Sequence, residues 1–405
     1  MAMTRPVATA AQENTLEEDN RQLVSSLQDL QQSLANAAQP THYCQKIYRL
    51  SLFVSDYSKA DEYVKTIRRF FNGNRDLVSD SPSFWTKDNT PILEIIYQPP
   101  LSGAPFALEA WGIACSSPNL FQMSRLSPAV TEIKYDGLSW AHCFNVRPKV
   151  SDKLVYPRSL NVFDQIGRSY NAVGIPFEDV IRTWIYLGDI VGPEGATQRY
   201  KELNRARTDY FADTQFCMKY RSEAYNGEAY PASTGIGSDG KEVMISALTL
   251  KSDRLDVIAV PLENPQQTSA FNYGQVYSPS SPKFARALGI QWGDNGLIFI
   301  SGTASITDAE SRFVGDPVQQ TVCTLDNISC LIDRANCRQH GFSRFGAELK
   351  DLAFARVYIK RMEDYPAVSR TCREMCGNDV PMVFTQTDVC RPELLVEIEG
   401  VAFAK

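Results

Sequence analysis

Hydrophobic and polar positions recur in the same order in two long stretches of the chain. Between residues 173 and 250, a strand pattern, an amphipathic helix pattern, a short strand and a final strand follow one another in VIRTWIYLGDI, YKELNRARTDYF, YPASTGIG and EVMISALTL. The same order returns between residues 340 and 403 in AFARVYIKRMEDY, VSRTCREMC, VPMVFTQTD and ELLVEIEGVAF. Alternation with period 2 indicates strands, and a period near 3.6 indicates helices. The chain is therefore predicted to use one structural unit twice.

A third, fainter copy of the unit is predicted nearer the N-terminus. There, YRLSLFVSDYSKADEYVKTIRRFF supplies a strand and a helix with the right spacing, and PILEIIYQPPLSGAPFALEAWGIA follows with two strand patterns. Strands that pack edge to edge with helices over one face form an α/β or α+β unit. Three such units around an axis predict a closed, trimer-like body.

The first 40 residues are polar apart from a row of leucines at heptad-like spacing, which consists of Leu23, Leu27, Leu30 and Leu34. This spacing predicts a short amphipathic helix that packs on the body or on a second subunit. A partly disordered tail is the alternative. Residues 1–40 are accordingly treated as a separate segment from the regions 41–262 and 263–405.

Two carboxylates interrupt the apolar pattern of the last strand, in which Glu397 and Glu399 share one face. When the copies are superposed on this strand, Met244 and Ala107 stand opposite Glu397, so the carboxylate is not needed to build the fold. A buried carboxyl group beside another is driven toward its neutral form unless it is paired. One of the two is therefore a candidate proton donor, whereas salt bridges of both to Arg391 or Arg356 are the structural alternative.

Arg207 lies within the apolar stripe of its predicted helix, four residues after Leu203 and three before Tyr210. A guanidinium group on a core face requires an anionic partner. That partner is either an internal Asp or Glu or the carboxylate of a ligand. Arg391, which precedes the terminal strand, is a parallel candidate.

A turn-rich loop, AFNYGQVYSPSSP, contributes Tyr273 and Tyr277, which either cap the core or line a pocket. The strand GLIFISGTASI carries Gly302, where the missing side chain permits close approach of a ligand or of another backbone. A simple tight turn is the alternative at Gly302.

Composition and charge narrow the function classes. The 405 residues are 43% hydrophobic, enough for two or three ordinary domains with filled cores. The net charge of −6 and the lack of a Lys/Arg cluster argue against nucleic-acid binding. No apolar run approaches the roughly 18 to 20 residues that span a bilayer, and the N-terminus lacks the apolar core of a signal peptide. A cytoplasmic protein is expected.

The ten cysteines show none of the tight pairs of a zinc or thioredoxin motif and are expected to be reduced. Cys323, Cys330 and Cys337 recur every seven residues and are predicted to lie on one face of a single helix as buried thiols. A metal site is not expected, because such a row does not converge on one point. The glycines of YPASTGIGSDG follow no nucleotide-binding pattern and are interpreted as a turn.

Several of these segments together resemble the chorismatases, which are tandem relatives of the RidA/YjgF fold. The resemblance rests on VYIKRMEDY, FISGTASI, PASTGIG, ENP and above all TQTDVCRPELLVEIEG, and it covers roughly residues 135–405. It implies a degenerate RidA/YjgF-like region at 41–262 and a RidA/YjgF-like domain at 263–405 that carries the acid.

Members of that family cleave chorismate and release pyruvate. The resemblance implies that Glu397 is the general acid, that Arg207 and Arg391 hold the substrate's carboxylates, and that no metal or organic cofactor is required. It also implies that Tyr273, Tyr277 and Glu399 belong to the substrate site. Gly302 and Cys390 match the type that forms 3-hydroxybenzoate, so Cys390 is grouped with Glu397 as catalytic. The expected partner is a small dicarboxylate, and a monomer and a homo-oligomer both remain open.

The chain also departs from the family pattern. Ser280 stands where relatives carry an arginine, and Thr307 and Val314 stand where they carry histidines. These departures leave open an altered chorismate-like substrate or a non-catalytic ligand-binding or scaffold protein. An imine-hydrolysing deaminase would need an arginine where Val383 and Phe384 stand, so that alternative ranks lowest.

Overall fold

The computed structural model describes residues 2–3, 16–38, 44–73, 89–221, 225, 227–274 and 280–405. The chain forms two compact units, residues 1–144 and residues 145–405. Each unit is described by itself. The predicted boundaries at 40 and 262 stay a prediction, because the second unit contains two copies of the repeated structure and a compact unit of this kind can hold more than one domain.

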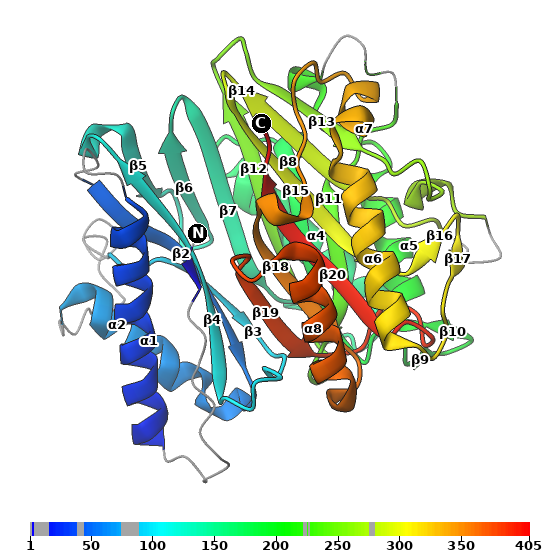
Figure 1. Ribbon diagram of the computed structural model, residues 1–405, viewed down its shortest axis with the longest axis horizontal. Coiled ribbons are helices and arrows are strands. Elements are labelled where there is room, and N and C mark those ends of the chain that lie inside the picture. Colours follow the sequence, from blue (N-terminus) through cyan, green and yellow to red (C-terminus); the bar gives the residue numbers. More distant parts are fainter. Residues whose placement is uncertain are drawn as a thin grey trace. The chain divides into compact units, whose positions relative to one another are not determined.

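Three copies of the predicted unit are present (Figure 1). The first copy comprises β2 (Cys44–Val54), α2 (Ala60–Asn72), β3 (Ile92–Ile96) and β4 (Phe106–Cys115). The second comprises β8 (Val180–Gly188), α5 (Arg199–Phe211), β11 (Ala232–Ser238) and β12 (Val243–Ser252). The third comprises β18 (Leu352–Ile359), α8 (Tyr365–Cys376), β19 (Met382–Gln386) and β20 (Val396–Phe403). In each copy the first strand pairs parallel with the short strand and antiparallel with the final strand, so the repeat is confirmed.

The strand registers confirm the predicted superposition of the copies. Glu397 lies opposite Tyr358, Met244 opposite Tyr186, and Ala107 opposite Phe53. An aromatic residue therefore marks the same position of the first strand in every copy. The carboxylate at 397 is an addition to the third copy and has no counterpart in the other two.

In the first unit, α1 (Leu16–Ala37) precedes β2 and buries the predicted leucine row against the sheet. The helix is confirmed, and the alternative of a disordered tail is wrong for its residues. A short strand, β1 (Ala2–Met3), pairs with β4. The unit continues through an antiparallel meander of β5 (Phe121–Arg125), β6 (Val130–Tyr135) and β7 (Leu138–Val146).

The second unit opens with α4 (Val155–Asn171), which packs on α5 and β12. After the second copy come β13 (Ile258–Leu262), β14 (Ala287–Trp292) and β15 (Asn295–Ala304), which pair in series and continue into β20, β18 and β19. The helix α6 (Pro317–Ile332) and α8 pack side by side on one face of this sheet (Figure 1). Ile398 and Val396 point to one side of β20, and Glu397 and Glu399 point to the other.

A β-bulge interrupts the pairing of β15 with β20. The register shifts between Ile300 and Thr303, which leaves Ser301 and Gly302 as extra residues opposite Glu399. The bulge frees their polar groups from the β15–β20 ladder, and both bond to β11 of the second copy. Ser233 N–H donates to Ser301 Oγ at 2.8 Å, and Gly302 N–H donates to Thr234 Oγ1 at 3.0 Å. The bulge thereby joins the second and third copies.

Two local predictions are wrong. The cysteine row does not lie on one helix, because α6 ends at Ile332 and Asp333 caps a new helix, α7 (Arg334–Gln339), by accepting from Ala335 N–H at 2.7 Å. YPASTGIG was predicted as the short strand of its copy, and β11 confirms it, whereas the interpretation of the glycines of YPASTGIGSDG as a turn is wrong for Gly235 and Gly237, which lie inside β11. A Cβ atom at Gly235 would meet Tyr200 at 2.9 Å, so glycine there permits close packing of α5 on the strand.

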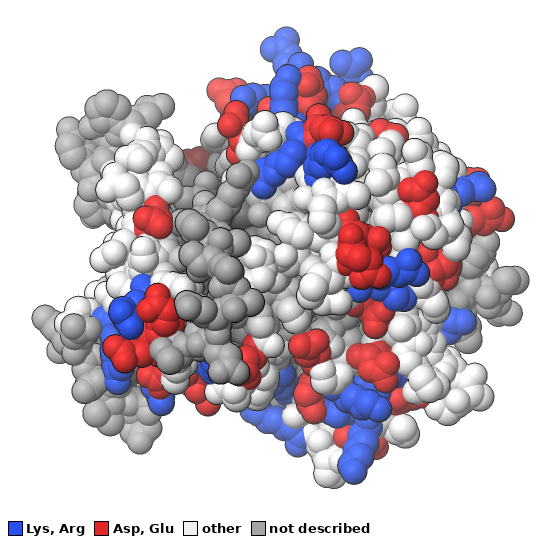
Figure 2. All heavy atoms as spheres, turned by 60° about the horizontal axis from the view of Figure 1, so that its bottom comes forward, with Lys and Arg blue, Asp and Glu red and all other residues white. Residues whose placement is uncertain are grey.

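Basic and acidic side chains are interspersed over the face shown in Figure 2. Within the described ranges, no helix combines the length and the hydropathy of a membrane-crossing segment. The narrow ribbon β9 (Pro193–Glu194) with β10 (Thr197–Gln198) and the ribbon β16 (Ile306–Thr307) with β17 (Glu310–Ser311) flank the site described next.

Candidate active site

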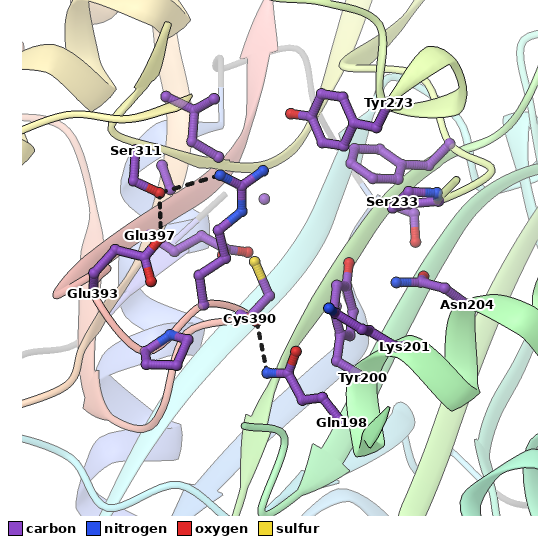
Figure 3. Close-up of a pocket in the computed structure, with 18 of the residues that line it drawn as sticks. Gln198, Tyr200, Lys201, Asn204, Ser233, Tyr273, Ser311, Cys390, Glu393 and Glu397 are labelled. Atoms are coloured by element: carbon purple, nitrogen blue, oxygen red, sulfur yellow. Dashed lines mark hydrogen bonds between the residues drawn. The ribbon is translucent and has the colours of Figure 1, made fainter. Parts of the chain in front are cut away.

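A cavity of about 440 Å³ lies between the second and third copies, within the second unit. The second copy lines it with side chains from β10, α5 and β11, which include Gln198, Tyr200, Lys201, Asn204 and Ser233. The third copy and the strands before it contribute Tyr273, Phe284, Arg286, Gly302, Cys390, Arg391 and Glu397. Figure 3 shows Glu397 and Cys390 on one side and Tyr200, Asn204 and Ser233 across from them. The volume of the cavity is suited to a small molecule.

Three glutamates line this cavity, Glu310, Glu393 and Glu397, and Glu397 is the buried one. Its side chain is 4% exposed, and the described part of the chain donates no hydrogen bond to its carboxyl group. Burial, followed by the negative charge of Glu399, raises the pKa of Glu397 to about 8, although Arg286 and Arg182 oppose the shift. A carboxyl group in this state holds its proton at neutral pH and can donate it to a bound molecule.

Glu399, two residues away, has the opposite surroundings. Its Oε2 accepts from Arg182 Nη2 and from Thr234 Oγ1, and its Oε1 accepts from Tyr358 Oη at 2.7 Å and from Arg356 Nη1 at 3.2 Å. These four donors satisfy the buried carboxylate. Glu399 lies behind the cavity wall, and the sequence prediction that it contacts the substrate therefore rests on the family resemblance alone.

Gly302 of the bulge determines the space beside Glu397. A Cβ atom at this position would lie 2.0 Å from Glu397 Oε1 and 3.1 Å from Thr234 Cγ2. Only a residue without a side chain lets the carboxyl group occupy its observed place. The sequence analysis expected a ligand or another backbone to approach Gly302, or a tight turn there. Gly302 lies in β15, and the group that approaches it is the side chain of Glu397.

Arg207 is buried at 1% exposure, directly behind the cavity wall. Its Nη2 donates to Asn204 Oδ1 at 2.7 Å, its Nη1 lies 3.4 Å from Ser233 Oγ, and the group stacks over Phe284. Among the residues that the structure describes, none forms a salt bridge with Arg207, and its Nε has no hydrogen-bond partner. Burial lowers the pKa of Arg207. Because no carboxylate of the described residues pairs with Arg207, the structure favours the second of the two partners considered from the sequence, which is the carboxylate of a ligand.

Tyr200, which lines the cavity, extends this polar cluster. Burial raises the pKa of its phenol, so the hydroxyl group stays protonated. Tyr200, Asn204 and Arg207 lie on successive turns of one face of α5. The helix thus presents a phenol and an amide to the cavity, and it holds the Arg207 cation behind them.

A second cation, Arg286, comes from the residue that directly precedes β14. Arg286 is 3% exposed, donates to Tyr273 Oη, and donates to Thr268 O at 3.1 Å. Its charge lowers the pKa of Glu263, which burial raises on balance. Tyr273, predicted either as a core cap or as a pocket residue, is buried and lines the cavity.

Arg391 and Cys390 complete the wall next to Glu397. Arg391 Nη1 donates to Ala309 O at 2.9 Å and to Ser311 Oγ at 3.2 Å, which ties the segment before β20 to the β16–β17 ribbon. Burial, followed by the charge of Glu397, raises the pKa of the Cys390 thiol to about 12. Cys390 is therefore an uncharged thiol at neutral pH, and it shapes the cavity next to the acid.

Most sequence candidates converge here. Glu397, Cys390, Arg391, Tyr273 and Gly302 line the cavity, and Glu399 and Arg207 stand behind its wall. Tyr277 lies outside the described residues. Of the three positions that depart from the family pattern, Val314 lines the cavity, whereas Ser280 and Thr307 do not.

Several site residues escaped the sequence analysis, namely Arg182, Tyr200, Asn204, Ser233, Thr234 and Arg286. Arg182 and Arg286 had a usable signal, because each is a charged residue inside an apolar strand pattern, in VIRTWIYL and in FARALGI. Ser233 and Thr234 had no such signal, because short hydroxyl side chains are ordinary in strands.

Over the described ranges, no cluster of His, Cys, Asp and Glu side chains is arranged to hold a metal ion.

The raised pKa of Glu397 predicts a pH-dependent stability. Between the ordinary value of 4.5 and about 8, the folded protein retains a proton that the unfolded chain releases. The free energy of unfolding therefore falls as pH rises through this window and levels off above it. Glu397→Gln lacks this ionisation. Its free energy of unfolding is therefore expected to exceed that of the wild type by roughly a few kcal/mol at pH 9. Thermal melting of both proteins from pH 5 to pH 9 checks this, and parallel melting curves would contradict it.

The chain has relatives of known name. It is 32% identical over 286 residues to a chorismatase of Streptomyces rapamycinicus, a match that covers 66% of this chain and 77% of that protein. It is 37% identical over 231 residues to a 3-hydroxybenzoate synthase of Streptomyces hygroscopicus, which covers 56% of this chain and 64% of that protein. The latter match spans just under two thirds of the relative's length. No model of a protein family matches the chain.

A crystal structure of a chorismatase has the same fold. It superposes with a TM-score of 0.65 at 21% identity, over 88% of this chain and 93% of that one. At this level of identity the likeness concerns the fold, and it agrees with the repeated sheet-and-helix architecture described above.

Proposed function

The chain belongs to the chorismatase family, and from that membership we propose that it cleaves the enolpyruvyl ether of chorismate to pyruvate and 3-hydroxybenzoate. The observation that carries the proposal is the Glu397 carboxyl group, which is buried, lines the cavity and receives no hydrogen bond from the described protein residues. Burial and the charge of Glu399 raise its pKa to about 8, so it holds a proton at neutral pH. Such a group is suited to protonate a carbon–carbon double bond, a step that needs a neutral acid of raised pKa.

Charge in the cavity fits a dianionic substrate. Three cationic side chains line it, Lys201, Arg286 and Arg391, and besides Glu397 two carboxylates do so, Glu310 and Glu393. Arg207 adds a further positive charge behind the wall and has no carboxylate partner among the described residues. The two carboxylates of chorismate would find counter-charges in these groups. Their negative charge next to Glu397 would also disfavour its ionisation, so substrate binding would help the acid retain its proton.

The reaction begins with transfer of the Glu397 proton to the methylene carbon of the enolpyruvyl group. Positive charge then develops on the ether carbon and its oxygen. A ring hydroxyl attacks the neighbouring ring carbon, the bond from that carbon to the ether oxygen breaks, and its electron pair completes the ketone of pyruvate. The ring then rearranges and loses a proton to become aromatic, which replaces the proton that Glu397 gave. The two products together contain the atoms of chorismate, so no water is consumed.

The 3-hydroxybenzoate product is supported by two positions. Gly302 and Cys390 flank Glu397 and carry the residues that the family resemblance associates with this product. The small Gly302 and the uncharged thiol leave the acid next to the ring without offering a charged competitor for its proton.

Incubation of the purified protein with chorismate tests the proposal. Pyruvate is measured with a coupled lactate dehydrogenase assay, and the aromatic product is separated by chromatography. Equal amounts of pyruvate and 3-hydroxybenzoate are expected. A dihydroxycyclohexadienoate instead would overturn the product assignment, and the absence of pyruvate would overturn the reaction.

The pH dependence of turnover follows from the same group. Because the protonated form of Glu397 is the active one, kcat/KM is expected to be flat at neutral pH and to fall above a pH of about 8, by about tenfold per unit. The fall in kcat is expected at a higher pH, because the bound dianion raises the pKa of Glu397 further. A pH–rate profile from pH 6 to pH 10 checks this. A rate that rises through pH 8 would indicate that the group acts as a base.

A further inference from the structure

A single hydroxyl group links the two glutamates of the terminal strand. Thr234 of β11 is 1% exposed, and its Oγ1 accepts from Arg182 Nη2 at 2.6 Å and from Gly302 N–H at 3.0 Å while it donates to Glu399 Oε2. A hydroxyl group can donate once and accept twice. All three capacities are used, and because Arg182 and the backbone N–H can only donate, the hydroxyl proton must point at Glu399.

The same residue touches the wall of the cavity. The side of Gly302 where a side chain would begin is occupied by Glu397 Oε1 and by the methyl group of Thr234. Gly302 belongs to the bulge, so its N–H has no ladder partner on β20 and depends on Thr234. Ser301 of the bulge is held separately by Ser233 N–H and by Ala285 O, so the hydroxyl group of Thr234 is the group that holds Gly302.

We propose that Thr234 is a positioning residue for the reaction, because its hydroxyl group ties the backbone of Gly302 to the Arg182–Glu399 pair and thereby fixes the wall against which the carboxyl group of Glu397 lies. The proposal rests on the proposed function for its kinetic consequence. Its structural part concerns the ligand-free protein and stands without it.

The charge arrangement shows why such a tie is needed. Glu397 has no hydrogen bond from the described residues that would fix its carboxyl group, so its place is set by contacts with its surroundings. Glu399 is held from four sides and forms a rigid anchor. Thr234 transmits that rigidity across the bulge to the acid, and small displacements of a reacting group are costly in rate.

Two substitutions separate the hydroxyl group from the bulk of the side chain. Thr234→Val keeps the shape and removes all three hydrogen bonds, whereas Thr234→Ser keeps the hydroxyl group and removes only the methyl group. With chorismate, kcat is expected to fall by about tenfold to a hundredfold in Thr234→Val with KM within about threefold. The alkaline limb of its pH–rate profile should move to lower pH, because a loosened wall admits water to Glu397. Thr234→Ser should resemble the wild type in each respect.

A measurement on the ligand-free protein makes the test independent of turnover. The C=O stretch of the protonated Glu397 is isolated by infrared difference spectroscopy between each protein and the same protein with Glu397→Gln. The band is expected to disappear near pH 8 in the wild type and in Thr234→Ser, and at lower pH in Thr234→Val. If Thr234→Val fails to fold, Thr234→Ala takes its place.

The outcomes are distinct. A Thr234→Val protein with the infrared titration and kinetics of the wild type would overturn the proposal, and so would equal impairment of Thr234→Ser. If no variant, nor the wild type, released pyruvate, the proposed function would fail, whereas a shifted infrared titration in Thr234→Val alone would still support the positioning role.

Discussion

Glu397→Gln is expected to lower pyruvate release from chorismate by at least about a thousandfold while the protein stays folded. Glutamine is neutral and nearly the same shape as the protonated glutamic acid, so the fold at pH 7 loses neither a charge nor a hydrogen bond from the described residues. What it loses is the transferable proton. Initial rates with the coupled pyruvate assay, together with circular dichroism melting at the same pH, measure the two effects.

The matched control is Glu374→Gln, which makes the same change at an exposed position of α8. It should leave both rate and melting temperature unchanged. Pyruvate release from Glu397→Gln within threefold of the wild type would remove Glu397 from the mechanism. A melting temperature several degrees lower would instead mean that the carboxyl group supports the fold, contrary to its lack of partners among the described residues.

The repeat could be predicted because it depends on patterns of hydrophobic and polar residues that are local in the sequence. Each copy carries period-2 and period-3.6 segments in the same order, and the fainter first copy was predicted from the spacing of its strand and helix patterns. The face shared by Glu397 and Glu399 follows from the geometry of a strand, and the asymmetry between copies singled out Glu397. These inferences need only residues that are close in the sequence.

The sequence did not predict that, among the described residues, Glu399 is paired while Glu397 is not. Glu399 forms a salt bridge with Arg182 and accepts a hydrogen bond from Thr234, and these residues lie 217 and 165 residues earlier in the chain. Which carboxylate is paired depends on how the second and third copies pack, and strand patterns do not specify that. The sequence analysis correctly offered Arg356 as a partner, because β18 and β20 are neighbours within one copy.

The role of Gly235 and the end of α6 were predicted wrongly for a related reason. Gly235 reads as a turn residue, but its role is to admit Tyr200 of α5, a tertiary contact. The break between α6 and α7 depends on the cap at Asp333, which interrupts an otherwise continuous helical pattern and moves Cys337 off the predicted row. Both errors arise where packing or capping overrides a periodic signal.

Arg207→Met is expected to weaken catalysis without weakening the fold. A buried guanidinium group that lacks an internal carboxylate costs free energy, which a neutral side chain of similar length would recover. In the described structure the contacts of Arg207 are with Asn204, Ser233, Tyr200 and Phe284, all uncharged. If its counter-charge arrives with the substrate, its removal should raise KM and lower kcat/KM by about tenfold to a hundredfold, as expected for the loss of a hydrogen bond to a charged group.

Arg199 on the same helix provides the opposite case. It is also buried, but it pairs with Glu194 at 3.0 Å and bonds the carbonyl groups of Gly188 and Lys241. Arg199→Met should therefore lower the melting temperature and leave KM for chorismate near that of the wild type, whereas Arg207→Met should raise KM and leave the melting temperature equal or higher. Steady-state kinetics and thermal melting of the two variants together decide the matter. A lower melting temperature of Arg207→Met together with an unchanged KM would show that the cation stabilises the core. If the substrate is the counter-ion of Arg207, the substitution must weaken substrate binding more than it weakens the ligand-free fold.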